Sequence, residues 1–226
     1  MSTRSRTAPF ALALLVGALG CDPGAPGSFP PSDPELAAQN QAAGDPYGGR
    51  FPFEEAVAGL PESGQLVATI VTEEGEVPCR LMPDIAPLAV ANFVGLARGL
   101  RPFLDPASET WQTRPFYDGL PFHRAVERQF VQGGRMGESL FVGYFLQDER
   151  SIGTVFDKPG VLALGNDGRP NTSSAEFFIT TDVLRQLDGA YTIIGRCEAP
   201  LVVRALEART LAGDPASIET VRISRE

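Results

Sequence analysis

The sequence predicts a mainly β fold, a closed antiparallel barrel with two helices. Many short runs of β-branched and aromatic residues are separated by turn residues. Only two longer segments, at 86–99 and around Val202 and Leu206, show helical periodicity. Of the 226 residues 43% are hydrophobic. With the ends set aside, about 150 to 175 residues remain, which is enough for one buried core. We therefore expect a single domain.

Residues 1–20 have the features of a signal peptide. Two arginines precede an apolar run from Ala8 to Gly20, which is too short to anchor stably across a bilayer. Ala18 and Gly20 before Cys21 resemble the lipobox of bacterial lipoproteins, whose cysteine becomes the lipidated first residue. An ordinary cleaved signal with an incidental cysteine remains the alternative. We expect a protein of the bacterial cell envelope, with lipid on Cys21 in a membrane and the domain in the periplasm.

Residues 21–52 are predicted to be a flexible tether. They are rich in Pro, Gly, Ala and Asp and have almost no large aliphatic side chains to bury. Residues 53–63 follow as a short capping helix and lead-in to the domain. Pro52 suits a first helical turn there, and the apolar residues Phe53, Ala56, Val57 and Leu60 recur at helical spacing.

The domain itself is predicted to begin with a hairpin and a helix. QLVATIVT (65–72) and EVPCRLM (76–82) alternate as strands around the turn EEGE. The segment APLAVANFVGLARG then changes to helical spacing, with Pro87 at its start and Gly99 past its end. A second helix is expected around Val202 and Leu206. Further short strands are expected at 120–126, 129–133, 161–164, 176–180, 191–197 and 217–224.

Two cysteines other than Cys21 lie in the chain. Cys79 and Cys197 both fall in strand-like runs, and an even pair in an oxidising compartment favours a disulfide. Two buried free thiols are the alternative, because the sequence does not show whether the two Cα atoms lie within bonding range.

The charge of the chain argues against a nucleic-acid partner. The formal net charge is -9, and the cations are scattered singly along the chain. Phosphate recognition needs clustered lysines and arginines. We expect no nucleic-acid surface.

The segment FHRAVERQFVQGG (122–134) contains the only histidine of the chain, His123. If 122–126 and 129–133 are strands joined by a tight turn, Phe130 and Gln132 share a face toward which Arg124 can point. The same alternation in EFFIT separates Phe177 from Phe178, leaving a second aromatic outside the core. An apolar pocket with an arginine is typical of a binding site. Each residue also has a plain structural alternative, as a surface ion pair, a strand-edge amide or a core aromatic.

Several motifs in order resemble the cyclophilin family of peptidyl-prolyl cis-trans isomerases. They are PDIAPLAVANF, FYDGLPFHR with the following QGG, FDKPGVLALGNDGRPNTSSAEFFIT and LDGAYTIIG. The resemblance covers residues 64–226, which we take as one cyclophilin-like isomerase domain. It implies a closed eight-stranded antiparallel barrel capped by two helices, with a peptide groove on the outer surface.

The resemblance also implies roles for individual residues. Arg124 would be catalytic, and Gln132 would hold the substrate backbone. Rotation about an X-Pro bond faces a barrier of ~20 kcal/mol from amide conjugation, and a permanently charged arginine is suited to stabilise the twisted amide. No cofactor or metal is implied. The proline pocket would be lined by Phe130, Phe178 and Leu187, and the peptide chain would contact Gly165 and Asn166.

The sequence departs from the family at several groove positions. Gln129 stands where the family usually has a pocket phenylalanine, and Phe130 where methionine is common. Gln186 stands at a frequent tryptophan position, Tyr191 replaces a histidine at the groove edge, and Glu176 replaces a glutamine. The resemblance places all five at or beside the groove, so the substrate preference is expected to differ from that of the usual members.

Two hypotheses about function follow. The first is an isomerase that accelerates X-Pro isomerisation and assists the folding of exported proteins, with proline-containing peptides and unfolded exported chains as partners. The second is a catalytically weak module that binds proline-containing segments of envelope proteins. A hydrolase or metal site is disfavoured, because the sequence has no second histidine and no G-x-S-x-G elbow, and we interpret His123 as structural. We expect a monomer.

Overall fold

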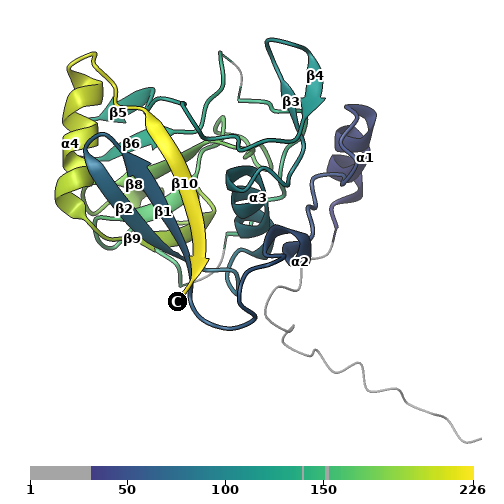
Figure 1. Cartoon of the computed structure of the whole chain (residues 1–226), viewed down its shortest axis with the longest axis horizontal. Helices are drawn as coiled ribbons and strands as arrows, with labels where there is room; N and C mark the ends of the chain where they lie inside the picture. Colours follow the sequence, from purple (N-terminus) through teal and green to yellow (C-terminus); the bar gives the residue numbers. More distant parts are fainter. Residues whose placement is uncertain (1–31, 139, 151–152) are drawn as a thin grey trace, which may run out of the picture.

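A computed structural model describes residues 32–138, 140–150 and 153–226. Within them, eight strands form one antiparallel sheet, as the sequence predicted, in the order β10-β1-β2-β9-β7-β8-β6-β5. The sheet curls around a core in Figure 1. Its strands are β1 (Leu66–Thr72), β2 (Gly75–Leu81), β5 (Arg124–Val126), β6 (Phe130–Gly133), β7 (Val161–Leu164), β8 (Phe177–Thr180), β9 (Ile193–Cys197) and β10 (Ile218–Arg225).

The two edges of the curled sheet meet at only one point, near the starts of β5 and β10, in the part of the chain that the structure describes. β10 and β5 are its edge strands, and no ladder runs between them along their length in the described residues. The segments that lead into them meet instead at the bridge between Pro121 and Ser217, and Phe122 N donates to Ala216 O at 3.0 Å. The expected closed barrel is therefore a strongly curled sheet. The register is the reason, because the antiparallel bridge sets Arg124–Val126 beyond the start of β10 at Ile218, so that the two edge strands do not lie opposite each other.

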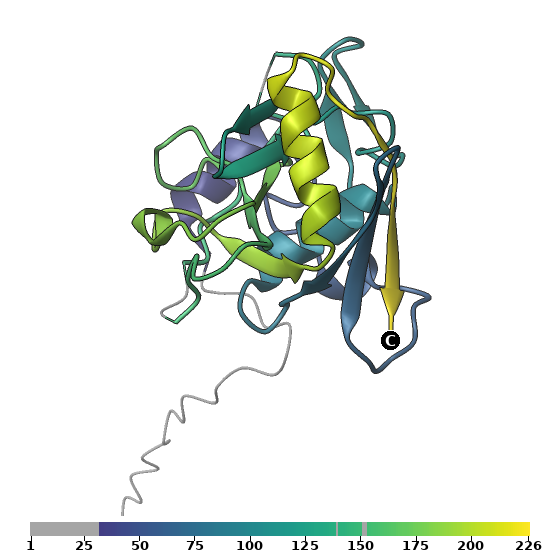
Figure 2. The ribbon, with the colours of Figure 1, turned by 90° about the vertical axis from the view of Figure 1, so that its left-hand side faces the viewer.

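Two long helices cover the curled sheet on opposite sides (Figures 1 and 2). α3 (Pro87–Ala97) is buried at every position, and α4 (Pro200–Leu211) buries Val203 and Leu206. Both begin with proline at the first turn, where its fixed φ suits a helix and its missing N–H costs nothing. Both predicted helices are confirmed. No helix in the described ranges is long and apolar enough to cross a membrane.

Cys79 and Cys197 lie directly opposite each other on β2 and β9 and form a disulfide bond. Of the two alternatives left open by the sequence, the bonded one is observed. The bridge spans a sequence separation of 118 residues. In the loop-entropy account a bridge of this span stabilises the folded state by about 4 to 5 kcal/mol.

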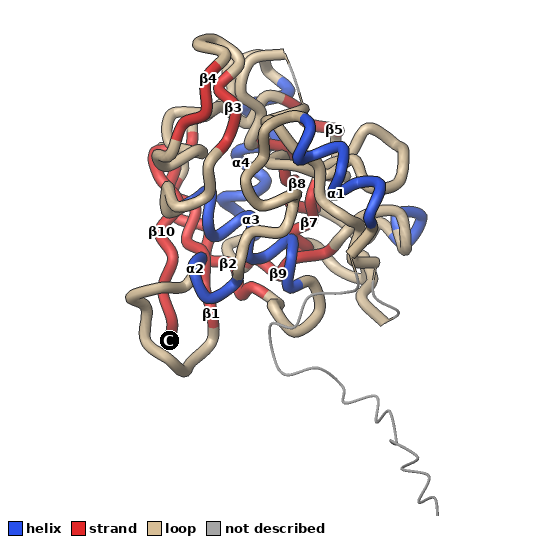
Figure 3. Tube along the Cα trace, turned by 90° about the vertical axis from the view of Figure 1, so that its right-hand side faces the viewer, coloured by secondary structure: helices blue, strands red, loops and turns tan. Residues whose placement is uncertain are grey.

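The segment before the domain is ordered, so the expected flexible tether is wrong for residues 33–52. α1 (Pro34–Ala42) begins at Asp33, whose carboxylate accepts hydrogen bonds from the first turn. Asn40 is fully buried and exchanges two hydrogen bonds with the backbone of Phe145, at 2.8 and 2.9 Å. Figure 3 shows α1 and the single-turn helix α2 (Phe53–Ala56) on the face of the domain that carries α3. Residues 1–31, with the predicted signal peptide and Cys21, lie outside the described residues.

A buried ion pair fixes this segment to the domain. Asp45 and Arg101 have no exposed side-chain surface and form two parallel hydrogen bonds of 2.7 Å. The guanidinium also stacks over the ring of Tyr144, with its carbon 3.8 Å from the centroid. Composition does not reveal this pairing, because the segment has few apolar side chains and its polar contacts are with distant residues. Of those few, Phe51 is buried in the core and Tyr47 packs against it.

A small hairpin that the sequence analysis did not predict packs on the same segment. β3 (Phe103–Asp105) pairs with β4 (Thr110–Gln112) as a separate sheet. Trp111 of β4 lies against the backbone of Gly44 and Gly143, where an added Cβ would stand 3.1 and 2.6 Å from its ring. Trp111 is therefore a packing residue.

A buried carboxylate caps α3. Ala86 offers no side-chain cap, and Glu149 fills its place, with oxygens accepting from Leu88 N at 3.0 Å and Ala89 N at 2.8 Å. Burial raises the pKa of Glu149 from 4.5 to about 7, against the opposing effect of the two backbone donors and Arg50. The cap is thus partly protonated near neutral pH.

Breaking the buried ion pair should destabilise the protein strongly. Asp45→Asn leaves the guanidinium of Arg101 buried without a counter-ion, which costs about 3 to 5 kcal/mol. Urea unfolding should show this loss. Glu76→Gln, which breaks the exposed pair between Glu76 and Arg222, is the control and should cost less than about 1 kcal/mol. Equal losses in the two variants would contradict the role given to Asp45.

The Glu149 cap should give the stability a defined pH dependence. Between pH 4.5 and 7 the folded state holds a proton on Glu149 that the unfolded chain has released, so this contribution is complete below pH 4.5 and is lost as the pH rises to about 7. The free energy of unfolding of the parent, relative to Glu149→Gln, should fall across that interval and level off above it. A constant difference from pH 4 to 8 would show that Glu149 does not titrate there.

Candidate active site

The register of β5 and β6 places the two most important polar side chains together. Arg124 is the cross-strand partner of Gln132, and its Nη1 donates to Gln132 Oε1 at 3.0 Å. The turn between the strands is tight, because Gln129 N donates to Val126 O and Arg128 adopts a positive φ of 57°. The predicted turn and shared face are both observed. The guanidinium carbon of Arg124 also lies 4.9 Å from the ring centroid of Phe130.

Alternation on β8 sends its aromatics to opposite sides of the sheet. Phe177 and Ile179 belong to the core inside the curl, as predicted. Phe178 belongs to a second apolar cluster outside it, where it stacks on Phe156, meets Tyr191 edge to face and contacts Phe130 at a tilt. The sheet therefore carries an apolar platform on its outer face.

A cavity of about 380 Å³ opens on this platform. Eight of the ten residues that the sequence analysis assigned to catalysis or substrate binding line it. They are Arg124, Phe130, Gln132, Gly165, Asn166, Phe178, Leu187 and Tyr191. Apolar rings form one part of its wall and polar side chains the other.

Gln129 and Gln186 do not line the cavity. Gln129 lies at the end of the β5–β6 turn, where its N–H donates to Glu207 of α4 and its carbonyl accepts from Thr181. Gln186 is exposed on the short helix η1 (Arg185–Leu187), which directs its neighbour Leu187 to the cavity instead. Their assignment to substrate binding by resemblance finds no support in the geometry.

Two charged residues complete the lining: Arg135, which the sequence analysis did not single out, and Glu176, which it placed at or beside the groove. Glu176 is 1% exposed and accepts hydrogen bonds from Gln132 Nε2 and Arg135 Nε. Because a carboxylate only accepts, it fixes the amide orientation of Gln132, with nitrogen toward Glu176 and oxygen toward Arg124. The glutamate in EFFIT was visible in the sequence, but its partner was not.

Gly134 explains how Arg135 comes to this place. Its φ is +82°, and a Cβ there would stand 2.8 Å from Ala175 O. The second glycine of the QGG motif thus lets the chain leave β6 against the segment that precedes β8. Arg135 follows directly and reaches Glu176 across this close approach.

His123 stands behind the cavity and does not line it. Its Nε2 lies 3.8 Å from Glu176 Oε2, and burial lowers the pKa of the imidazole although Glu176 opposes the shift. The ring is therefore neutral at pH 7. This position agrees with its interpretation as a structural residue.

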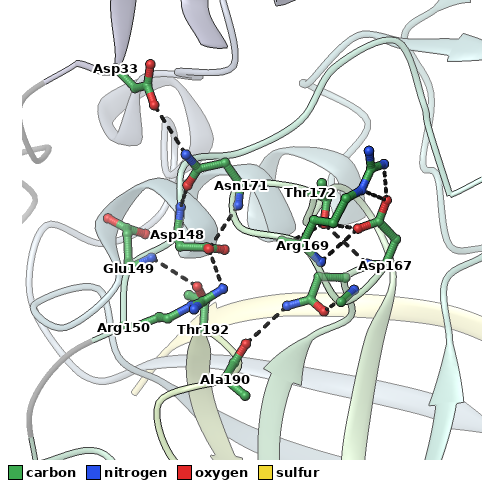
Figure 4. A network of polar contacts seen from close by, with 12 residues as sticks. Asp33, Asp148, Glu149, Arg150, Asp167, Arg169, Asn171, Thr172, Ala190 and Thr192 are labelled. Carbon is green, nitrogen blue, oxygen red and sulfur yellow. Dashed lines mark hydrogen bonds and ion pairs between the residues drawn. The ribbon is translucent and has the colours of Figure 1, made fainter. Parts of the chain in front are cut away.

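The loop that supplies Gly165 and Asn166 is held by a polar network (Figure 4). Asp148 and Asn171 exchange two backbone-to-side-chain hydrogen bonds of 2.9 Å, and Asn171 Nδ2 donates to Asp33 at the start of α1 at 3.2 Å. On the cavity side, Asn166 Nδ2 donates to Ala190 O at 3.1 Å. The N-terminal segment and the wall of the cavity are thus parts of one framework.

The arrangement suits the holding of an apolar ring beside a fixed cation. Apart from Tyr191, the titratable side chains that line the cavity are the two arginines and Glu176 with both oxygens engaged. None of these residues is placed as a nucleophile paired with a base. What the site offers is apolar surface and oriented N–H donors, which suits a reaction that rotates a bond and breaks none.

Comparisons with known proteins agree with this geometry. The family described as cyclophilin type peptidyl-prolyl cis-trans isomerase/CLD matches residues 67–225. Peptidyl-prolyl cis-trans isomerase A of Mycobacterium tuberculosis is 36% identical over 171 residues, covering 70% of this chain and 91% of the relative. Peptidyl-prolyl cis-trans isomerase B of Streptomyces anulatus is 35% identical over 160 residues, covering 70% and 90%.

A solved structure shows the same fold. The crystal structure of a cyclophilin type peptidyl-prolyl cis-trans isomerase from Cryptosporidium parvum superposes with a TM-score of 0.58 at 26% identity, covering 73% of this chain and 99% of that one. The family match spans both the curled sheet and the cavity residues described above. The chain therefore belongs to the cyclophilin family of peptidyl-prolyl cis-trans isomerases.

Proposed function

We propose that this protein isomerises X-Pro bonds in proteins exported to the bacterial cell envelope, while lipid on Cys21 anchors it to a membrane. The observation that carries the isomerase part is the hydrogen bond from Arg124 to Gln132 beside the part of the cavity that Phe130 and Phe178 line. The export and anchoring parts rest on the N-terminal sequence, with its apolar run and the small residues before Cys21.

The proline ring enters the apolar part of the cavity, against Phe130, Phe178 and Leu187. Arg124 donates one N–H to Gln132 and has further N–H groups that can donate to the substrate. A donor directed at the prolyl nitrogen draws its lone pair out of conjugation with the carbonyl, which lowers the barrier of ~20 kcal/mol to rotation. Each 1.4 kcal/mol removed is about a tenfold rate increase.

The binding-module alternative is supported by one feature of the cavity. Both ends of the Gln132 amide are already engaged, the oxygen by Arg124 and the nitrogen by Glu176. If Gln132 is to hold a substrate backbone, it has to share or release these bonds. A site of this kind could bind proline segments and still catalyse slowly.

Replacing Arg124 should separate the two possibilities. Exchange of an Ala-Pro peptide, measured by NMR with residues 22–226, should be accelerated by the parent and about 10²-fold less by Arg124→Ala, because the oriented donor is lost. Arg222→Ala, exposed on β10, is the control and should match the parent. Peptide binding without acceleration by the parent would support the binding module. The chain must include residues 33–50, because truncation at Phe53 would remove Asp45.

The anchor requires a separate test. Expressed with its signal in a lipoprotein-processing bacterium, the full chain should incorporate labelled palmitate and sediment with membranes, and Cys21→Ser should do neither. Cys79→Ser serves as the control for loss of a cysteine and should still be labelled. If the Cys21→Ser protein is exported and recovered in the same fraction as the parent, the alternative of an ordinary cleaved signal peptide is supported.

A further inference from the structure

Four side chains form a continuous polar chain across the cavity. Arg124 donates to Gln132, Gln132 donates to Glu176, and Arg135 donates to the other oxygen of Glu176. Glu176 is almost completely buried and has no oxygen left over. A cationic substrate side chain therefore finds no free carboxylate in this wall, and it would have to displace Arg135 to reach one.

The two arginines, by contrast, keep donors available. Among the described residues, Arg124 donates only through Nη1 and Arg135 only through Nε, so none of these residues accepts from their remaining N–H groups. The side chain of Arg135 is 30% exposed. A planar guanidinium with two free Nη groups is suited to a carboxylate.

The charge around the cavity has the opposite sign to that of the protein. Two arginines and one glutamate line the cavity, whereas the formal net charge of the whole chain is -9. The nearby Asp167 is occupied by Arg169 and Thr172. The cavity is thus a local cationic site on an acidic protein.

Arg135 lies at the end of the cavity next to the Gly165 loop. A Cβ on Gly165 would stand 3.2 Å from Glu176 Cβ and 3.2 Å from Gln132 Nε2, so Glu176 fills the space beside this glycine. Arg135 is held there by Glu176, while Arg124 is held over the Phe130 ring at the apolar end. A peptide lying along Gly165 and Asn166 would bring a side chain close to the proline toward Arg135.

We propose that Arg135 is a specificity-determining residue, which selects substrates with an acidic side chain one or two residues before the proline. The inference rests on the proposed isomerase function. Glu176 positions Arg135 and at the same time neutralises part of its charge. Removal of Arg135 and removal of the Glu176 charge should therefore change the selectivity in opposite directions.

The test compares two sets of peptides. One set carries Glu, Gln or Lys directly before the proline, and the other carries the same three residues one position earlier. At one of the two positions, the kcat/KM of the parent for the Glu peptide should be about threefold or more above that for the Lys peptide. This Glu-to-Lys ratio should fall in 0.5 M NaCl. Arg135→Gln should bring the ratio close to one. Arg185→Gln removes an exposed charge outside the cavity and should keep the parent ratio.

Glu176→Gln should change the selectivity in the opposite direction. Because it leaves two uncompensated arginines, it should raise the Glu-to-Lys ratio of kcat/KM above that of the parent. A parent that isomerises the Gln peptides but does not prefer Glu at either position overturns the inference and leaves the isomerase intact. A preference that survives in Arg135→Gln, or fails to rise in Glu176→Gln, also overturns it. If none of the peptides is isomerised by the parent, the proposed function itself fails.

Discussion

The register of β5, β6, β8 and β7 holds the side chains of the site in place. Arg124 pairs with Gln132, Gln132 with Phe178, and Phe178 with Ala163, so one row across four strands carries the cation, the amide and the aromatic floor. Side chains alternate between the two faces of a strand, and a slip of one residue would send this row into the core. Phe177 and Ile179, packed inside, prevent such a slip because their burial is favourable only in the observed register.

The sheet has two apolar faces, and this is why the cavity exists. The inner face packs on α3 and the larger core, while the outer face carries the cluster around Phe156, Phe178 and Leu184. An exposed apolar face of this kind needs cover, and here it is covered at its rim by Tyr191 and Leu187 but left open above Phe130 and Phe178. In the proposed function, the substrate proline would take the place that a core side chain takes in an ordinary sheet.

The N-terminal segment belongs to the same framework as the cavity. Asp45 secures it through the buried pair with Arg101, and Asp33 reaches the Asn171 loop that leads back to Gly165 and Asn166. Asn171 has a positive φ of 58°, which neighbouring contacts must hold in place. The residues that join the domain to its N-terminal sequence therefore also support one wall of the cavity.

Local sequence patterns and the family resemblance were enough to predict the strands, the two long helices and most of the cavity residues. Strand and helix periods are local, and the faces they assign to Arg124, Gln132 and Phe178 follow from alternation alone. Of the eight cavity residues named beforehand, Gly165, Asn166, Leu187 and Tyr191 were named from the family resemblance alone, and the other four from the resemblance together with alternation. Three features became visible only in the folded protein: the ordered conformation of residues 33–50, the pairing of Arg135 with Glu176, and the position of Gln129 and Gln186 outside the cavity. These depend on contacts between residues far apart in the chain, such as Asp45 with Arg101 and Gln129 with Glu207, and no local pattern records which distant charges will meet when the sheet curls.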